Sequence, residues 1–185
     1  MSAVIPELVE DIQKRRDGEA PEPGIPSGFQ LFDRKLGGWR RKPYIIAGRP
    51  GMGKSALVAQ CCAQVAVAGY AAILISLEMD RSELATRLLS SYARVPYRKI
   101  ESADLLESQW NDVKAASHVL RHIPLSIVRA PAVTVARVRT IIRQEMARLR
   151  GVYGEDVELG MVAVDYVQLI DGEQRRNESR DSELS

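Results

Sequence analysis

Hydrophobic positions along the chain follow two patterns: short apolar runs, and longer segments with apolar residues on one side only. The short runs are YIIAG at residues 44–48, AAILISLEMD at 71–80, PLSIVRAP at 124–131 and MVAVDYVQL from residue 161. Nearly continuous apolar runs are typical of parallel strands that are covered on both faces of a sheet. We therefore predict four strands at these places.

Helical periodicity fills the segments between the later runs. Apolar residues recur at helical spacing over residues 81–94 and 104–122, and a further helix, with Thr134 as its N-cap, is predicted to extend to about Arg150. The five arginines of that last helix form either a solvated outer face or a binding patch. Strands that alternate with helices predict right-handed crossovers, so the predicted fold class is α/β, a three-layer domain with a mainly parallel central sheet.

The N-terminal part of the chain has a different pattern. Residues 4–16 carry apolar residues at helical spacing and end in basic residues, which predicts a short amphipathic helix. The following DGEAPEPGIPSG is rich in proline and glycine and predicts an extended linker. The apolar side of such a helix needs a partner, either its own domain or a neighbouring subunit. We predict a linker region at residues 1–23 and a domain at residues 24–185.

Composition narrows the classes of protein. With 185 residues, 45% of them apolar, the chain is long enough for one domain with a proper core. The 26 basic and 24 acidic residues nearly cancel, so net charge neither indicates nor excludes a nucleic-acid partner. The sequence predicts no membrane span and no secretory signal, hence a cytoplasmic location. The adjacent Cys61 and Cys62 are expected to pack as small apolar side chains, because neighbours in a helix make poor disulfide partners.

The segment GRPGMGKS at residues 48–55 connects the first predicted strand to a helix. Its glycines let the main chain wrap closely around a phosphate and adopt positive φ. Such a turn also directs backbone NH groups and the positive end of the helix dipole at one point. Lys54 can reach the β- and γ-phosphates of a nucleotide, and the Ser55 hydroxyl can bind the accompanying magnesium ion. The predicted phosphate-binding residues are Gly48, Arg49, Pro50, Gly51, Met52, Gly53, Lys54, Ser55 and Ala56.

Two carboxylates follow later strands, at the edge where ligands bind in parallel sheets. Asp165 ends the apolar MVAV and can hold magnesium opposite Ser55, although a strand-end aspartate can also cap a turn. Glu78 follows ILISL and can orient and deprotonate the water that attacks the γ-phosphate. Its alternative role is that of a surface or salt-bridged glutamate. The predicted catalytic residues are therefore Lys54, Glu78 and Asp165, with Ser55 and Asp165 as the metal ligands.

From about Gly24 to its last residue the sequence resembles the motor domain of DnaB-type replicative DNA helicases, which has a RecA-like P-loop fold. The resemblance rests on GIPSGFQLFDRKLGGW, IIAGRPGMGKSAL, ISLEMDRSELATRLLSSYARV, VAVDYVQLI and RRNESRDSELS. It implies hydrolysis of ATP with Mg²⁺. It also implies that Lys54 and Ser55 bind the nucleotide, that Glu78 is the catalytic base and that Asp165 is the second acidic motif.

The resemblance further implies a ring of six subunits around single-stranded DNA. The N-terminal helix is similar to the family's linker helix, which packs on the adjacent subunit and favours that alternative. Arg175, Arg176 and Arg180 match the start of a DNA-facing region, and their other interpretation is a solvated loop. A primase or a helicase loader is a possible further partner.

The sequence departs from the family pattern at both ends. The separate N-terminal domain is absent, and the chain stops soon after Asp165, before a sensor strand and the arginine finger. We therefore expect a fragment of a longer motor or a truncated relative, whose sheet would expose unpaired backbone groups or rearrange. Besides a helicase motor, two other functions stay open: a RecA-like recombination or clock-type ATPase, and a nucleotide-binding module without turnover.

Overall fold

The computed structural model describes residues 4–17, 24–131 and 133–165. The chain divides into two compact units, residues 1–43 and 44–185, and each is described by itself. The predicted boundary between residues 23 and 24 stays a prediction, as does the linker, because residues 18–23 lie outside the described part. No helix in the described ranges is long and apolar enough to cross a membrane.

Two helices lie in the first unit. The predicted N-terminal helix is confirmed as α1, Val4–Arg16, and its apolar Ile5, Val9 and Ile12 are more than half exposed. The partner of this apolar side stays a prediction.

The second helix of this unit, α2 (Gln30–Leu36), was not predicted. The chain on either side of it is joined by an antiparallel bridge, in which Ile25 and Trp39 exchange main-chain hydrogen bonds of 2.9 and 2.7 Å. Gly24 and Gly38 cross so closely that a Cβ on either would lie 2.5 to 2.6 Å from main-chain oxygen. These two positions accept only glycine, which explains the glycines of the segment that precedes the phosphate turn.

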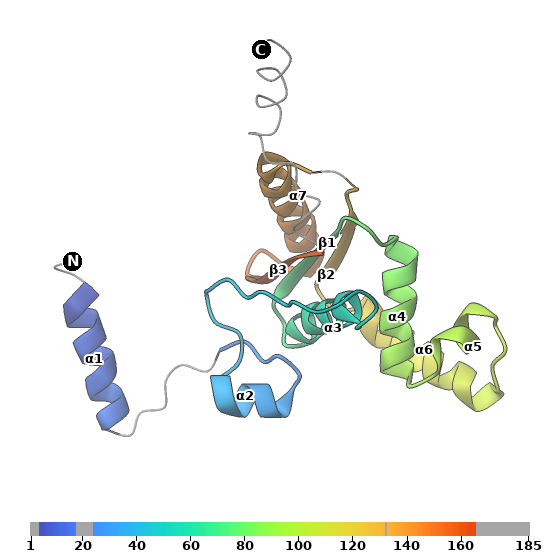
Figure 1. Cartoon of the computed structure of the whole chain (residues 1–185), viewed down its shortest axis with the longest axis horizontal. Coiled ribbons are helices and arrows are strands. Elements are labelled where there is room, and N and C mark those ends of the chain that lie inside the picture. The colour runs from blue at the N-terminus through green and yellow to red at the C-terminus, as the bar shows by residue number, and fades with distance from the viewer. Residues whose placement is uncertain (1–3, 18–23, 132, 166–185) are drawn as a thin grey trace, which may run out of the picture. The chain divides into compact units, whose positions relative to one another are not determined.

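The second unit is built on three parallel strands in the order β2-β1-β3 (Figure 1). Their bounds are Ala71–Ser76 for β1, Leu125–Arg129 for β2 and Leu159–Asp165 for β3. All six residues of the central β1 are buried, which accounts for its continuous apolar sequence. The α/β fold class with a parallel sheet and three of the four predicted strands are confirmed.

The helix α7 covers one face of the sheet (Figure 1). It spans Val135–Tyr153, and the hydroxyl of Thr134 accepts a hydrogen bond from the NH of Arg137, which confirms the predicted cap. Ile141 and Leu149 are buried against the odd-numbered side chains of β1. The five arginines of this helix are exposed, which leaves both interpretations of them open.

The helix α3, Lys54–Val67, covers the other face. Its buried residues are small, mostly alanine and cysteine, and therefore let the helix approach the sheet closely. Cys61 and Cys62 are buried and reduced, as predicted. Burial raises the pKa of Cys61 to about 11 and that of Cys62 to about 12, so neither thiol is reactive near neutral pH.

Three further helices extend this second layer. The helix α4, Arg81–Ala93, packs on α3 and confirms the prediction for residues 81–94. The helix α6, Glu107–Arg121, packs on α4 and confirms the helix predicted over residues 104–122. The short α5, Tyr97–Glu101, was not predicted. The domain thus has the three predicted layers, with helices on both faces of the sheet.

The layers follow from the order of the strands. The chain passes from β1 to β2 on the face of α3 and returns across β1 to β3 through α7 on the opposite face. A right-handed crossover that reverses its direction across a sheet must use the opposite face. The same rule applied to α3 requires any strand that precedes it to lie on the β3 side of β1.

The prediction of a strand at residues 44–48 is wrong, because this segment pairs with no strand. Its apolar side chains are exposed, Ile45 to 93%. The reason lies in the position that the crossover rule assigns to it, beyond β1 on the side that β3 occupies. Within the described ranges β3 pairs only with β1, so no strand beside its outer edge offers hydrogen bonds to residues 44–48. Without such a neighbour, an extended segment does not form a strand.

An acidic side chain joins α7 to the edge strand β2. Glu145 accepts hydrogen bonds from the Ser126 hydroxyl at 2.7 Å and from Arg148 Nε at 2.8 Å. Burial alone would raise the pKa of Glu145, but these hydrogen bonds and the charges of Arg148 and Arg81 outweigh it and lower the pKa below its ordinary 4.5. A carboxyl whose pKa is lowered by folding stabilises the folded chain above its unfolded pKa, and this contribution is lost as pH falls through the folded pKa.

We therefore expect Glu145→Gln to lose less stability than the wild-type chain between pH 7 and the acid side of pH 4.5, because the substitution removes this titrating group. Urea unfolding at a series of pH values measures the effect. Glu155→Gln, in an exposed loop, is the control and should follow the wild type. An unchanged pH dependence in Glu145→Gln would contradict the assignment.

Candidate functional site

The glycine-rich turn ahead of α3 has the geometry of an anion site. Gly51 and Gly53 adopt φ of 76° and 82°, in the left-handed region that glycine favours. Gly53 is the N-cap and supplies no side-chain hydrogen bond, so the first NH groups of α3 are left for a ligand. Lys54 Nζ donates to the carbonyl oxygens of Gly48 and Arg49, both at 3.0 Å. The ammonium group is thus held against the turn that it is predicted to serve.

Asp165 ends β3, as the sequence predicted. It pairs in register with Ser76, the last residue of β1, and its carbonyl oxygen accepts a 2.7 Å hydrogen bond from the NH of Leu77. Its side chain is 5% exposed, and Oδ2 has no hydrogen-bond partner among the described residues. A buried carboxylate oxygen without a partner is costly, so this atom is suited to a cation or its bound water.

The side chain of Asp165 lies on the face of the sheet that α3 covers. Side chains alternate between the two faces of a strand, and Met161, four residues earlier, contacts Cys62 of α3 with the sulfur atoms 3.8 Å apart. The intervening Val162 and Val164 pack in the core on the α7 side. Asp165 therefore points to the same layer as the phosphate turn.

The start of α3 lies level with the end of β3. A short turn connects α3 to β1, so the helix runs antiparallel to the strands. Starting from the contact of Cys62 with Met161, the eight residues back to Lys54 rise about 12 Å along the helix. The four residues on to Asp165 rise about 13 Å along the strand in the same direction. The fold thus brings the phosphate turn and Asp165 to one edge of the sheet.

Glu78 follows β1 at the same edge, in the turn that leads to α4. The register of β1 with β3 places this turn beside Asp165. Its side chain is exposed, unlike that of Asp165. The alternative of a salt-bridged Glu78 gains no support, because no ion pair of Glu78 occurs within the described part of the chain.

The residues present fit a nucleotide with magnesium. Ser55 is in the first turn of α3, and Asp165 offers an unpartnered oxygen at the same edge. The described residues contain no group of three or more histidine, cysteine or acidic side chains that could hold a metal alone. This agrees with an ion held jointly by a hydroxyl, a carboxylate and phosphate oxygens. The predicted DNA-binding residues Arg175, Arg176 and Arg180 lie outside the described residues and stay predictions.

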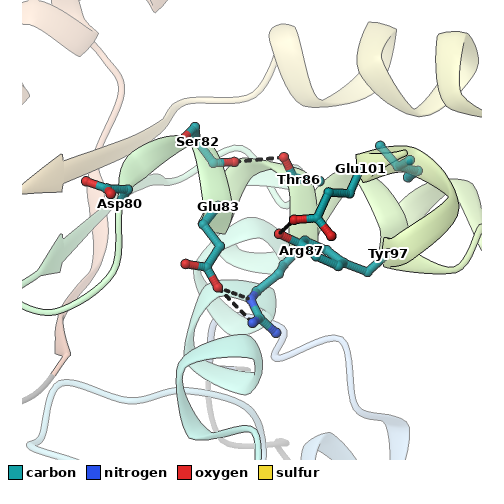
Figure 2. A pocket seen from close by; sticks show the side chains of 8 residues that line it. Asp80, Ser82, Glu83, Thr86, Arg87, Tyr97 and Glu101 are labelled. Carbon is teal, nitrogen blue, oxygen red and sulfur yellow. Dashed lines mark hydrogen bonds and ion pairs between the residues drawn. The ribbon is translucent and has the colours of Figure 1, made fainter. Parts of the chain in front are cut away.

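A separate pocket of about 770 Å³ lies between α4 and α5 (Figure 2). Its polar side chains are largely satisfied by one another. Arg87 donates to Glu83 at 2.8 Å, and the Tyr97 hydroxyl donates to Glu101 at 3.4 Å. Because these groups already bond to each other, the pocket adds no second site.

The P-loop turn at one edge of a three-layer parallel sheet defines the class of protein, a RecA-like nucleotide-binding domain. Two solved structures share this fold, each with a TM-score of 0.79. The first, a helicase ATPase domain, is 23% identical and is matched over 96% of this chain and 61% of its own. The second, a DnaB-like replicative helicase described with its interactions with primase, is 24% identical, with 92% and 40% covered.

Sequence comparison is more specific than the fold. Residues 24–185 match the DnaB-like helicase C terminal domain, and the chain belongs to this family. It is 34% identical over 165 residues to the replicative DNA helicase DnaB of Nostoc sp., covering 88% of this chain and 18% of the relative. It is 30% identical to the replicative DNA helicase DnaC of Bacillus subtilis, covering 98% and 39%. The chain thus spans well under half the length of these curated relatives.

Proposed function

We propose that the chain is the ATP-hydrolysing motor of a ring-shaped DNA helicase that translocates on single-stranded DNA in the cytoplasm and unwinds the duplex. The observation that carries this proposal is the level placement of the phosphate turn and the unpartnered Asp165 in a chain of the DnaB-like family. Family membership supports a helicase over a recombination or clock-type ATPase.

The proposed mechanism divides the work among four side chains. Lys54 binds the β- and γ-phosphates, and the NH groups of α3 complete their cradle. Ser55 and Asp165 hold magnesium, which when bound neutralises charge that develops on the phosphates. Glu78 accepts a proton from the attacking water. Its exposure leaves the carboxylate open to that water, whereas the buried Asp165 is placed to stay ionised beside a cation.

The partners of the motor follow from the same proposal. The exposed apolar side chains of α1 would dock on a neighbouring subunit of the hexamer, and Arg175, Arg176 and Arg180 would hold the DNA backbone. A primase or a helicase loader would bind the assembled ring. Support for a primase comes from a single relative, the DnaB-like replicative helicase whose interactions with primase are described.

A nucleotide-binding module without turnover is the second candidate. The observation in its favour is the unpaired segment at residues 44–48, because the phosphate turn then lacks a strand that fixes it from behind. Lys54 would still bind phosphate in such a module.

Hydrolysis of ATP with and without single-stranded DNA tests the proposal. We expect magnesium-dependent phosphate release that single-stranded DNA stimulates, because a motor couples turnover to its track. Turnover that is indifferent to DNA would instead support a recombination or clock-type ATPase. Tight nucleotide binding without any turnover would support the binding module and overturn the motor assignment.

A further inference from the structure

The turn that carries Glu78 is fixed on both sides of this residue. Before it, the NH of Leu77 donates to the carbonyl oxygen of Asp165 at 2.7 Å, and the Leu77 side chain is buried in the core. After it, Met79 is bonded twice to one hydroxyl: its NH donates to Ser76 Oγ at 3.0 Å, and Ser76 Oγ donates to its carbonyl oxygen at 2.8 Å. One exposed carboxylate therefore stands between two fixed neighbours.

Ser76 lies where the ends of the three strands meet. It is in register with Arg129 of β2 and Asp165 of β3, and its carbonyl oxygen accepts a 2.9 Å hydrogen bond from the NH of Ala130. Its side chain is fully buried, at the end of an otherwise apolar strand. A buried hydroxyl must be hydrogen-bonded, and both bonds that this one makes go to Met79. The hydroxyl therefore serves to close the turn.

A weaker contact ties the same turn to β2. Asp80 Oδ1 lies 2.9 Å from Arg129 Nε, and the two side chains are 65% and 49% exposed. An ion pair this exposed contributes little to stability. Its geometric effect is to join the far end of the turn to the strand on the other side of β1.

We propose that Ser76 is a positioning residue for Glu78, with the Arg129–Asp80 pair as a smaller second restraint. This inference rests on the proposed function, because it takes Glu78 as the base. A general base acts only within hydrogen-bond reach of the proton it removes. Without the Ser76 hydroxyl, the NH and carbonyl group of Met79 must find other partners, so the turn shifts and moves the Glu78 carboxylate.

The test compares Ser76→Ala with the wild-type chain in magnesium-dependent ATP hydrolysis with single-stranded DNA. We expect kcat to fall about 10- to 100-fold, since a displacement of about 1 Å can cost about 100-fold. Nucleotide affinity should not change, because Lys54 is held by carbonyl groups of its own loop. Ser76→Thr keeps the hydroxyl and should recover most of kcat.

The chain offers a matched control in Ser126→Ala. Ser126 is likewise a buried serine in a parallel strand and loses one hydrogen bond, to Glu145, when truncated. Its thermal unfolding should shift comparably, while its kcat stays at the wild-type value. Equal losses of kcat in Ser76→Ala and Ser126→Ala would mean a merely structural role and would overturn the inference. Should Ser76→Ala not fold, Arg129→Ala replaces it as the test, because the exposed Arg129 can be removed without touching the core.

Failure of this inference is distinguishable from failure of the proposed function. If the wild-type chain turns over and Glu78→Gln stalls, but Ser76→Ala keeps full kcat, only the positioning role is lost. If the wild-type chain does not hydrolyse ATP, or Glu78→Gln hydrolyses it normally, the proposed function fails and the inference with it.

Discussion

Replacing Lys54 with alanine is expected to abolish productive nucleotide binding. The ammonium group is the charge that the turn holds ready, at 3.0 Å from two of its carbonyl oxygens. A hydrogen bond to a charged group is worth about 1.5–3 kcal/mol, so affinity should fall about 10- to 100-fold. Turnover should fall further, by about 100- to 1000-fold, because the same charge stabilises the transition state. Fluorescence titration with a labelled nucleotide and phosphate release measure the two effects.

The fold of Lys54→Ala should remain intact, since the side chain bonds to its own exposed loop. Lys114→Ala is the matched control. It removes the same charge from α6, where Lys114 lies over the ring of Trp110. Wild-type affinity and turnover in Lys54→Ala would refute the phosphate assignment.

Glu78→Gln is expected to bind ATP and then stall. The amide keeps the size of the carboxylate but cannot accept a proton from water, and a general base contributes about 100- to 10,000-fold to a rate. Nucleotide affinity should remain at the wild-type level, because the phosphate turn is unchanged. Single-turnover hydrolysis with radiolabelled ATP separates the chemical step from binding.

Glu83→Gln, on the exposed side of α4, is the control for this substitution and should lose only its ion pair with Arg87. Normal hydrolysis by Glu78→Gln would mean that another residue is the base.

The sequence predicted most of the fold because its signals are local. The continuous apolar run of β1, the Thr134 cap and the helical spacing of α4, α6 and α7 each depend on neighbouring residues, and each was confirmed. The segment at residues 44–48 shows where this fails. Its composition is that of a buried strand, but a strand also needs a hydrogen-bonded neighbour, which is decided by residues distant in the sequence.

The candidate site was predictable to a similar extent. The glycines and Lys54 indicate a phosphate turn by spacing alone, and strand ends indicated Glu78 and Asp165. Their common edge required the register of β1 with β3, which no local pattern contains. Ser76 was missed because a serine at the end of an apolar run attracts no notice until its two bonds to Met79 are seen. The polar residue in AAILIS was the only signal available.

The central place of β1 determines how the second unit opens. Its main chain is paired on both sides and its side chains are packed on both faces, so its amide hydrogens are released to solvent only when the sheet comes apart. The outer strands β2 and β3 have one partner each within the described ranges and can fray separately. Deuterium uptake should therefore be slowest in Ala71–Ser76, and the turn that carries Glu78 begins at the end of the slowest-exchanging segment of the unit.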